Sequence, residues 1–267
     1  MNREEKVEYL VEQLIQENPG YASIQYPVDF TGKRRLLRSL MNVRFPGPIN
    51  PEVLKVQDEL LREELGEKGI VDVMDLPVIQ DEYPCTEIKN PDRIALWQGD
   101  ITRLKADAIV NAANSQMMGC FVPCHGCIDN AIHSAAGMEL RNECAQIMAE
   151  QGHEEPTGKA KITGGYNLPA NHVIHTVGPI VGTQVTEEQK EQLKSCYRSC
   201  LKLAEKNQLH SVAFCCISTG EFHFPNKLAA ELAVQVIDKY LSTGTVEKVV
   251  INVYKDEDFN IYKRVFR

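Results

Sequence analysis

The chain has 267 residues, of which 43% are hydrophobic and 25% are charged, and its formal net charge is −8. These values are ordinary for a soluble globular protein with one large domain or two smaller ones. The negative charge argues against a nucleic acid as the main ligand, because phosphate-backbone binding needs a basic face. The sequence has no apolar run of membrane-spanning length and no secretory signal. Since the number of cysteines, nine, is also odd, we expect a cytoplasmic protein without a disulfide framework or a membrane anchor.

The N-terminal part of the chain has a helical pattern. Apolar residues recur at helical spacing in three segments, which cover residues 7–15, 36–41 and 51–66. Asn18-Pro19-Gly20 ends the first segment, and Pro51 suits the first turn of the third. The stretch that follows contains prolines and acidic residues without a sustained period. We therefore divide the chain into a helical N-terminal region (1–68), a connector (69–90) and a second domain (91–267).

After residue 90, short apolar runs typical of strands alternate with amphipathic segments. The runs cover residues 94–97, 108–110, 173–175, 212–217 and 249–253. Two of the intervening helices have clear starts, a capping box at 186–189 and Pro225 in a first turn. Alternating buried strands and helices predict an α/β domain with a largely parallel or mixed sheet.

Three loops of this domain are candidates for ligand binding, because ligands of α/β domains bind in loops that leave the carboxyl ends of strands. They cover residues 99–102, 111–129 and 218–225. The backbone N–H groups of Ser218, Thr219 and Gly220 could converge on a pyrophosphate. An ordinary strand-to-helix turn explains the same residues.

The second of these loops has an unusual concentration of metal-ligating residues. Cys120, Cys124 and Cys127 lie within eight positions, together with His125 and Asp129, and Zn²⁺ prefers such sulfur and nitrogen ligands. In an extended segment alternate side chains share a face, so His125 and Cys127 can bind one ion while Cys124 faces away. Cys120, across the turn made by Pro123, can supply a third ligand.

Three protein ligands leave one tetrahedral position open, as in a catalytic zinc site. Two alternatives remain open at this stage. One is a closed structural site that uses all three thiols and His125. The other is a redox pair formed by Cys124 and Cys127, although the histidine between them favours a metal.

Five segments together resemble a macrodomain, the α/β fold that binds ADP-ribose. In order along the chain they cover residues 99–102, 109–114, 128–137, 175–179 and 217–225, within residues 85–267. The cysteine-rich segment 120–127 stands where hydrolytic macrodomains usually carry a glycine run. That replacement and the helical extension resemble the zinc-containing branch of microbial protein-ADP-ribose hydrolases, whose members are often encoded beside a sirtuin-type ADP-ribosyltransferase and a lipoyl-carrier protein.

The resemblance implies a macrodomain-type mixed sheet flanked by helices, with an N-terminal helical extension, and it implies roles for particular residues. It assigns catalytic roles to Asp129 and Asn114, and one Zn²⁺ per chain to Cys120, His125 and Cys127. The ADP-ribose contacts that it implies are Asp100, Ile101, Asn114, Cys127, Ile128, Asp129, Ser218, Thr219, Gly220, Glu221 and Phe222. Without the resemblance, Asp129 would be read as a helix cap, Asn114 as an Asx turn and Asp100 as a turn residue. We expect His133 to be packed and hydrogen-bonded rather than a ligand.

The function implied is that of a zinc-dependent hydrolase of the glycosidase class, which removes mono-ADP-ribose from modified protein side chains, acidic ones in particular. Its implied partners are ADP-ribose and an ADP-ribosylated protein, such as the lipoyl-carrier protein, with no nucleic acid and no membrane. The first alternative is a reader module that binds ADP-ribose without cleaving it. The second is a structural zinc protein with no nucleotide ligand.

Overall fold

Three helices form the N-terminal region, as the apolar spacing predicts. The computed structural model describes residues 1–21 and 23–267 and gives these helices as α1 (Arg3–Gln16), α2 (Phe30–Val43) and α3 (Pro51–Lys68), with a 3₁₀ turn η1 (Pro19–Tyr21). Side chains of Asn2, Asp29 and Asn50 cap their first turns. The helices share an apolar core, formed by Val7, Leu10, Val11, Leu14, Leu37, Leu40, Met41, Val53, Val56, Leu60, Leu61 and Met138.

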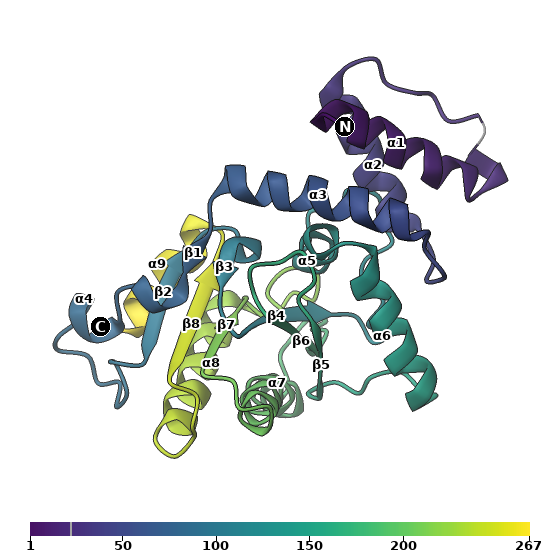
Figure 1. The fold of residues 1–267 in the computed structure, drawn as a ribbon. Helices are drawn as coiled ribbons and strands as arrows, with labels where there is room; N and C mark the ends of the chain where they lie inside the picture. The colour runs from purple at the N-terminus through teal and green to yellow at the C-terminus, as the bar shows by residue number, and fades with distance from the viewer. Residues whose placement is uncertain (22) are drawn as a thin grey trace.

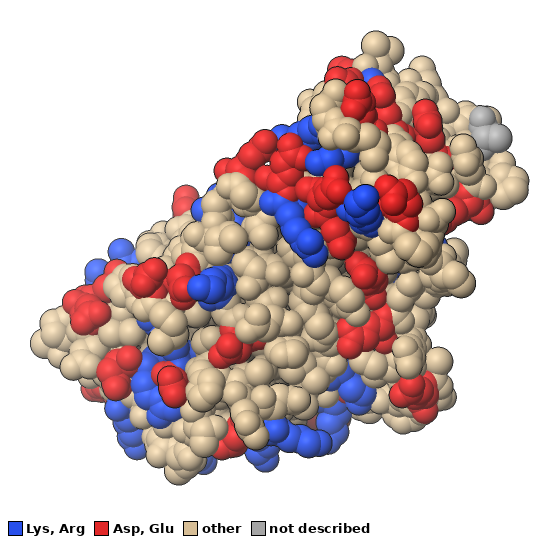
Figure 2. All heavy atoms as spheres, viewed as in Figure 1, with Lys and Arg blue, Asp and Glu red and all other residues tan. Residues whose placement is uncertain are grey.

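Charged side chains join these helices at the surface. On the face shown in Figure 2, acidic and basic residues lie side by side where α3 meets the other two helices. Arg34 of α2 binds Glu64 of α3 through two nitrogens, at 2.6 and 2.7 Å. Arg3 binds Glu67 at 2.6 Å, linking α1 to α3. The N-terminal region is therefore an ordered unit with its own core and its own ion pairs.

The connector contains short elements that attach it to the second domain. They are β1 (Val71–Asp72), the 3₁₀ turn η2 (Val73–Asp75) and α4 (Ile79–Glu82). Strand β1 pairs in parallel with β3 (Leu104–Lys105). Val73 and Ile79 are buried in the apolar core of the second domain. A strand of two residues and a helix of four are too short to produce a periodic pattern, so the sequence did not reveal them.

The second domain is built on a mixed sheet of six strands, as expected. The strands are β2 (Ile94–Gln98), β4 (Ala108–Ala113), β5 (Ala160–Gly164), β6 (His172–Val177), β7 (Ser211–Phe214) and β8 (Lys248–Val253), in the spatial order β2-β8-β7-β4-β6-β5. All neighbours are parallel except β5, an edge strand that runs antiparallel to β6. The expected strand at 212–217 ends at Phe214, where its pairing with β4 and β8 stops.

Helices cover both faces of this sheet (Figure 1). They are α5 (Ile128–Ala136) and α6 (Met138–Gln151) on one face, and α7 (Glu187–Lys206), α8 (Asn226–Leu241) and α9 (Asp256–Val265) on the other. The predicted capping box of Thr186 and Gln189 begins α7. Crossovers β4–β6 and β6–β7 run in opposite directions along the sheet, so right-handed connections put their helices on opposite faces. None of the helices in the described residues is long and apolar enough to span a membrane.

Candidate active site

The loops predicted to bind a ligand meet at one edge of the sheet. Strands β2, β4 and β7 are all parallel members of the sheet, so their carboxyl ends lie on the same side. Asp100 follows β2, with the 3₁₀ turn η3 (Ile101–Arg103) after it, and Asn114 follows β4. The segment 218–222 follows β7. The cysteine-rich loop leads from Asn114 into the N-terminus of α5, which is also where anions are stabilised.

The structure brings together the three predicted metal ligands. Ligand atoms of Cys120, His125 and Cys127 all lie within 4.8 Å of one another, and Nδ1 of His125 is 3.7 Å from Sγ of Cys120. Cys124 lies outside this group, as expected, and its thiol donates to the carbonyl oxygen of Arg35 at 3.4 Å. The reason differs from the expected one, because the φ angle of 53° at Cys124 belongs to a turn and not to an extended segment. This arrangement has the three-ligand composition of an open site rather than the four ligands of a closed one.

The chemistry of this group fits Zn²⁺. Two sulfurs and an imidazole nitrogen are donors that zinc prefers. Burial, with a smaller contribution from the neighbouring Cys120, raises the pKa of the Cys127 thiol to about 12. A bound divalent cation would hold such thiols as thiolates. The other ring nitrogen of His125, Nε2, faces the Glu221 carboxylate at 3.7 Å. A carboxylate partner of that kind orients metal-bound histidines in proteins.

Asp129 lies buried beside this group. Its Oδ1 accepts a hydrogen bond from Nδ2 of Asn111 at 2.8 Å. Burial raises the pKa of Asp129 to about 6, against the opposing effects of Asn111 and the Arg141 charge. The reading of Asp129 as the helix cap is wrong, because the N-cap of α5 is Cys127, whose Sγ accepts from the backbone N–H of Asn130 at 3.4 Å.

His133 is packed as expected, but it is not hydrogen-bonded. Both ring nitrogens are buried without a hydrogen-bond partner among the described residues, and Nε2 lies 3.5 Å from Oδ1 of Asp129. Burial keeps the pKa of His133 well below its usual value. The backbone of Gly119 runs against this ring: a Cβ there would lie 2.9 Å from its Cγ, and the φ angle of +80° also favours glycine.

Asn114 and Asp100 both make turn contacts of the kind that their residue types favour. Oδ1 of Asn114 accepts from the backbone N–H groups of Gln116 and Met117 at 3.0 and 3.1 Å, which is an Asx turn. Its Nδ2 donates to the carbonyl oxygen of Gly119 at 3.1 Å, so the same side chain also holds the start of the cysteine-rich loop. Oδ1 of Asp100 accepts from the backbone of Thr102 at 3.0 Å. These turn roles leave Oδ2 of Asp100 and the second N–H of the Asn114 amide for a ligand.

The segment 218–222 has a feature that indicates a ligand. Ser218 is buried, with φ of 66°, and its hydroxyl has no hydrogen-bond partner among the described residues. Such an unsatisfied buried hydroxyl is uncommon without a bound molecule or water. Glu221 is exposed and Phe222 is half-buried, whereas Phe224 is buried in the core. Among these aromatic side chains, Phe222 is therefore the one available at the site.

Two further residues of this edge were not found by sequence reasoning. Asn111 is fully buried in β4 and binds Asp129; the signal for it was a polar residue inside an apolar strand. Tyr254 follows β8 directly, is 76% exposed, and accepts at its carbonyl oxygen from Nε2 of Gln98 at 3.3 Å. Since β8 pairs in parallel with β2, Tyr254 and Asp100 follow neighbouring strands at the same edge of the sheet. The sequence feature that could have revealed Tyr254 is an aromatic residue immediately after a predicted strand.

Comparisons with known proteins agree with this architecture. The model of the Macro domain family matches residues 110–233. A protein named Protein-ADP-ribose hydrolase from Treponema medium is 48% identical over 266 residues, which is 99% of this chain and 99% of that protein. One of the same name from Staphylococcus aureus (strain MSSA476) is 46% identical over 263 residues, covering 98% and 95%.

A solved macrodomain structure is also similar to this chain. The Trypanosoma brucei macrodomain in complex with ADP-ribose superposes with a TM-score of 0.65 at 30% identity, over 85% of this chain and 94% of that one. The fold expected from the five motifs, a mixed sheet flanked by helices with an N-terminal helical segment, is therefore confirmed. The chain belongs to the macrodomain family.

Proposed function

We propose that this protein is a zinc-dependent hydrolase that removes mono-ADP-ribose from protein side chains, and that it acts in the cytosol. The observation that carries the proposal is the group formed by Cys120, His125 and Cys127, whose ligand atoms lie within 4.8 Å of one another beside the buried Asp129. Relatives that cover the whole chain carry the name Protein-ADP-ribose hydrolase. A reader module would need the same binding loops but not an open metal site next to a buried carboxylate.

Bound by these three residues, Zn²⁺ would supply Lewis-acid polarisation to a water molecule or to a hydroxyl of the distal ribose. Asp129 has the position of the general base. Asn111 fixes its Oδ1, while Oδ2 makes no hydrogen bond to the described residues and can accept a proton from the attacking group. Asn114, which anchors the start of the cysteine-rich loop, orients the distal ribose.

The remaining residues hold the nucleotide. Backbone N–H groups of Ser218, Thr219, Gly220, Glu221 and Phe222 face the diphosphate, with the N-terminus of α5 at Ile128 on its other side. Asp100 accepts from the adenine amino group, with Ile101 beside it. Exposed Tyr254 offers a ring on which the adenine can stack.

We propose an ester linkage to an acidic side chain as the bond that is released, because a polarised acyl or anomeric centre is open to attack by water. The substrate that the resemblance implies is a modified lipoyl-carrier protein. Such a protein, ADP-ribosylated on aspartate or glutamate, is the first substrate to test. A protein modified on arginine serves as the matched comparison.

The test measures release of ADP-ribose by the zinc-loaded protein, by the chelator-treated protein and after Zn²⁺ is restored. Circular dichroism must show that the chelated protein is still folded. We expect release that chelation abolishes and Zn²⁺ restores. Full activity in folded, metal-free protein contradicts the metal role. Binding of ADP-ribose without release in any state identifies a reader, and the absence of binding in calorimetry identifies a structural zinc protein.

A further inference from the structure

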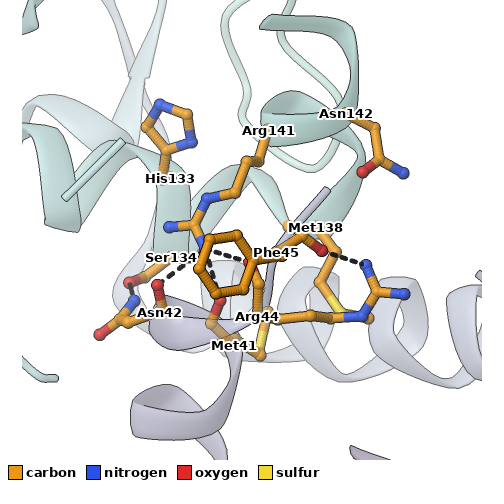
Figure 3. A pocket seen from close by; sticks show the side chains of 10 residues that line it. Met41, Asn42, Arg44, Phe45, His133, Ser134, Met138, Arg141 and Asn142 are labelled. Carbon is orange, nitrogen blue, oxygen red and sulfur yellow. Dashed lines mark hydrogen bonds between the residues drawn. The ribbon is translucent and has the colours of Figure 1, made fainter. Parts of the chain in front are cut away.

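The cysteine-rich loop is held from outside by helix α2 of the N-terminal region. We call residues 119–127 the metal loop. Asn42, in the last turn of α2, is 2% exposed, and its Oδ1 accepts from the backbone N–H of Cys124 at 2.9 Å. Its Nδ2 donates to the hydroxyl of Ser134 in α5 at 3.0 Å, a contact drawn in Figure 3. One buried amide thus ties α2, the metal loop and α5 together.

Arg38, one turn earlier in α2, reaches the same loop. Its Nη2 donates to the carbonyl oxygen of His125 at 3.4 Å and to Oδ1 of Asn130 at 2.8 Å. Asn130 is fully buried, and its Nδ2 donates to the carbonyl oxygen of Val122 at 3.1 Å. Its backbone N–H donates to Sγ of Cys127. Arg38 is therefore in contact with the backbone of one predicted ligand and linked through Asn130 to another.

Arg141 of α6 contacts both the end of α2 and the metal loop. It is 5% exposed, and Figure 3 shows it reaching the end of α2. Its guanidinium donates to the carbonyl oxygens of Asn42 and Arg44, both at 2.7 Å, and to that of Met118, also at 2.7 Å. Its Cζ lies 4.2 Å from the ring centroid of Phe121 in the metal loop. The end of α2 and the start of the metal loop are thereby joined through one side chain.

Cys124, the third thiol of the cluster, belongs to the same contact. Cys124 has a φ of 53°, its N–H is bound by Asn42, and its thiol donates to the carbonyl oxygen of Arg35 in α2. Both hydrogen-bond donors of Cys124, its backbone N–H and its thiol, are thus engaged by the helix. This explains why Cys124 faces away from Cys120, His125 and Cys127. It also gives the one thiol left out of the ligand set a role at the interface.

From these contacts we propose that α2 is part of the metal centre, with Arg38 and Asn42 as positioning residues that fix the metal loop in its ligating conformation. The inference rests on the zinc site of the proposed function and gives the N-terminal region a role in it. A loop without regular secondary structure binds a metal more tightly when its ligands are held in place beforehand, because ordering the loop otherwise opposes binding. The N-terminal region can supply that rigidity because it has its own core.

The experiment measures the affinity for Zn²⁺ by competition with a chromophoric chelator, in the full chain. Arg38→Ala and Asn42→Ala should each weaken zinc binding by about tenfold or more, the usual effect of removing an outer partner of a metal site. Arg34→Ala is the control: it lies one turn before Arg38 in the same helix and binds Glu64. It should lower the temperature of unfolding and leave zinc affinity within about twofold, well inside the tenfold effect.

A second measurement separates positioning from a loss of folding. Hydrogen exchange of the Cys124 amide should speed up in Asn42→Ala, whereas in Arg34→Ala it should match the parent. Zinc affinities of Arg38→Ala and Asn42→Ala within twofold of the parent, or an equal loss in Arg34→Ala, overturn the proposal and leave the zinc site standing. A parent protein that binds no zinc overturns the zinc site itself, and this inference with it.

Discussion

Nε2 of His125 lies 3.7 Å from Oε1 of Glu221, so a predicted metal ligand and the predicted diphosphate-binding segment meet at one imidazole ring. Nδ1 of the same ring faces Sγ of Cys120. A metal held by Cys120, His125 and Cys127 would therefore lie on the Nδ1 side of His125, with the Glu221 carboxylate on the Nε2 side. Through this one side chain, a bound metal and the diphosphate end of a bound nucleotide would be linked.

Replacing Glu221 by glutamine should weaken zinc binding by about tenfold, because a neutral amide is a poorer acceptor for the Nε2–H of a metal-bound histidine. The measurement is the zinc dissociation constant. Glu247→Gln is the matched control, since Glu247 faces the exposed His210 at 3.1 Å in a pair away from the cysteines. If both variants bind zinc as the parent does, Glu221 has no part in the site.

Replacing Asp129 by asparagine should lower release of ADP-ribose by at least about 100-fold, the usual effect of losing a general base. Asparagine keeps the shape and an oxygen that can accept from Asn111, so the affinity for ADP-ribose in calorimetry should change by only a few-fold. The measurements are the rate of ADP-ribose release and the affinity for ADP-ribose, because only together do they separate catalysis from binding. A variant that keeps the parent's rate shows that Asp129 is not the base, and one that no longer binds ADP-ribose shows a binding role instead.

Two glycines of the metal loop should respond differently to alanine. Gly119 has a φ of +80°, and an added Cβ would lie 2.9 Å from the His133 ring. A Cβ added at Gly126 would meet no other described residue, beyond its two chain neighbours, within 4 Å. Gly119→Ala should therefore lower the free energy of unfolding by about 1–3 kcal/mol and weaken zinc binding, because strain of this kind must be relieved by moving the loop. Gly126→Ala should have little effect on either quantity. Equal behaviour of the two variants in chemical denaturation would contradict the described loop conformation.

His175 should make the fold sensitive to mild acid. Burial lowers its pKa to about 3, below the usual 6.5. The unfolded chain therefore binds a proton there that the folded chain does not, and stability present above pH 6.5 is lost as the pH falls toward 3. Protonation of this residue in the unfolded chain lowers the free energy of unfolding by about 2 kcal/mol at pH 5.

The measurement is urea denaturation of the parent and of His175→Gln between pH 7.5 and 5, in chelator so that release of metal adds nothing. The parent should lose more stability than the variant. Some acid sensitivity should remain in the variant, because burial also lowers the pKa of the neighbouring His133. If the free energy of unfolding falls equally with pH in the two proteins, the role of His175 is contradicted.

Sequence patterns predicted most helices and strands, because these elements depend on residues that are close together in the chain. Helical spacing located α1 to α3, and apolar runs located β2, β4, β6, β7 and β8. The prediction that Cys124 would lie apart from His125 and Cys127 is confirmed. Its assumed cause, an extended segment, is wrong, because Cys124 has a φ of 53° in a turn. The edge strand β5 was missed because its residues, Ala160–Gly164, are short, mixed in polarity and only partly buried.

Contacts between distant parts of the chain were not predictable from these patterns. Asn42 and Cys124 are 82 positions apart, and Arg38 and Asn130 are 92 apart. Each residue has an ordinary local environment, in a helix or in a loop, and only the fold brings the pairs together. Residue preference alone would give the cap of α5 to Asp129, whereas that carboxylate is buried and bound by Asn111, and Cys127 is the cap.

The zinc content of purified protein, measured by inductively coupled plasma mass spectrometry, tests the central claim most directly. The parent and Cys124→Ser should each contain one zinc per chain, and Cys120→Ser and Cys127→Ser should contain little or none. The contrast between Cys124→Ser and the other two variants is the specific expectation of a three-ligand open site. Loss of zinc in Cys124→Ser, or its retention in Cys120→Ser and Cys127→Ser, would contradict the account.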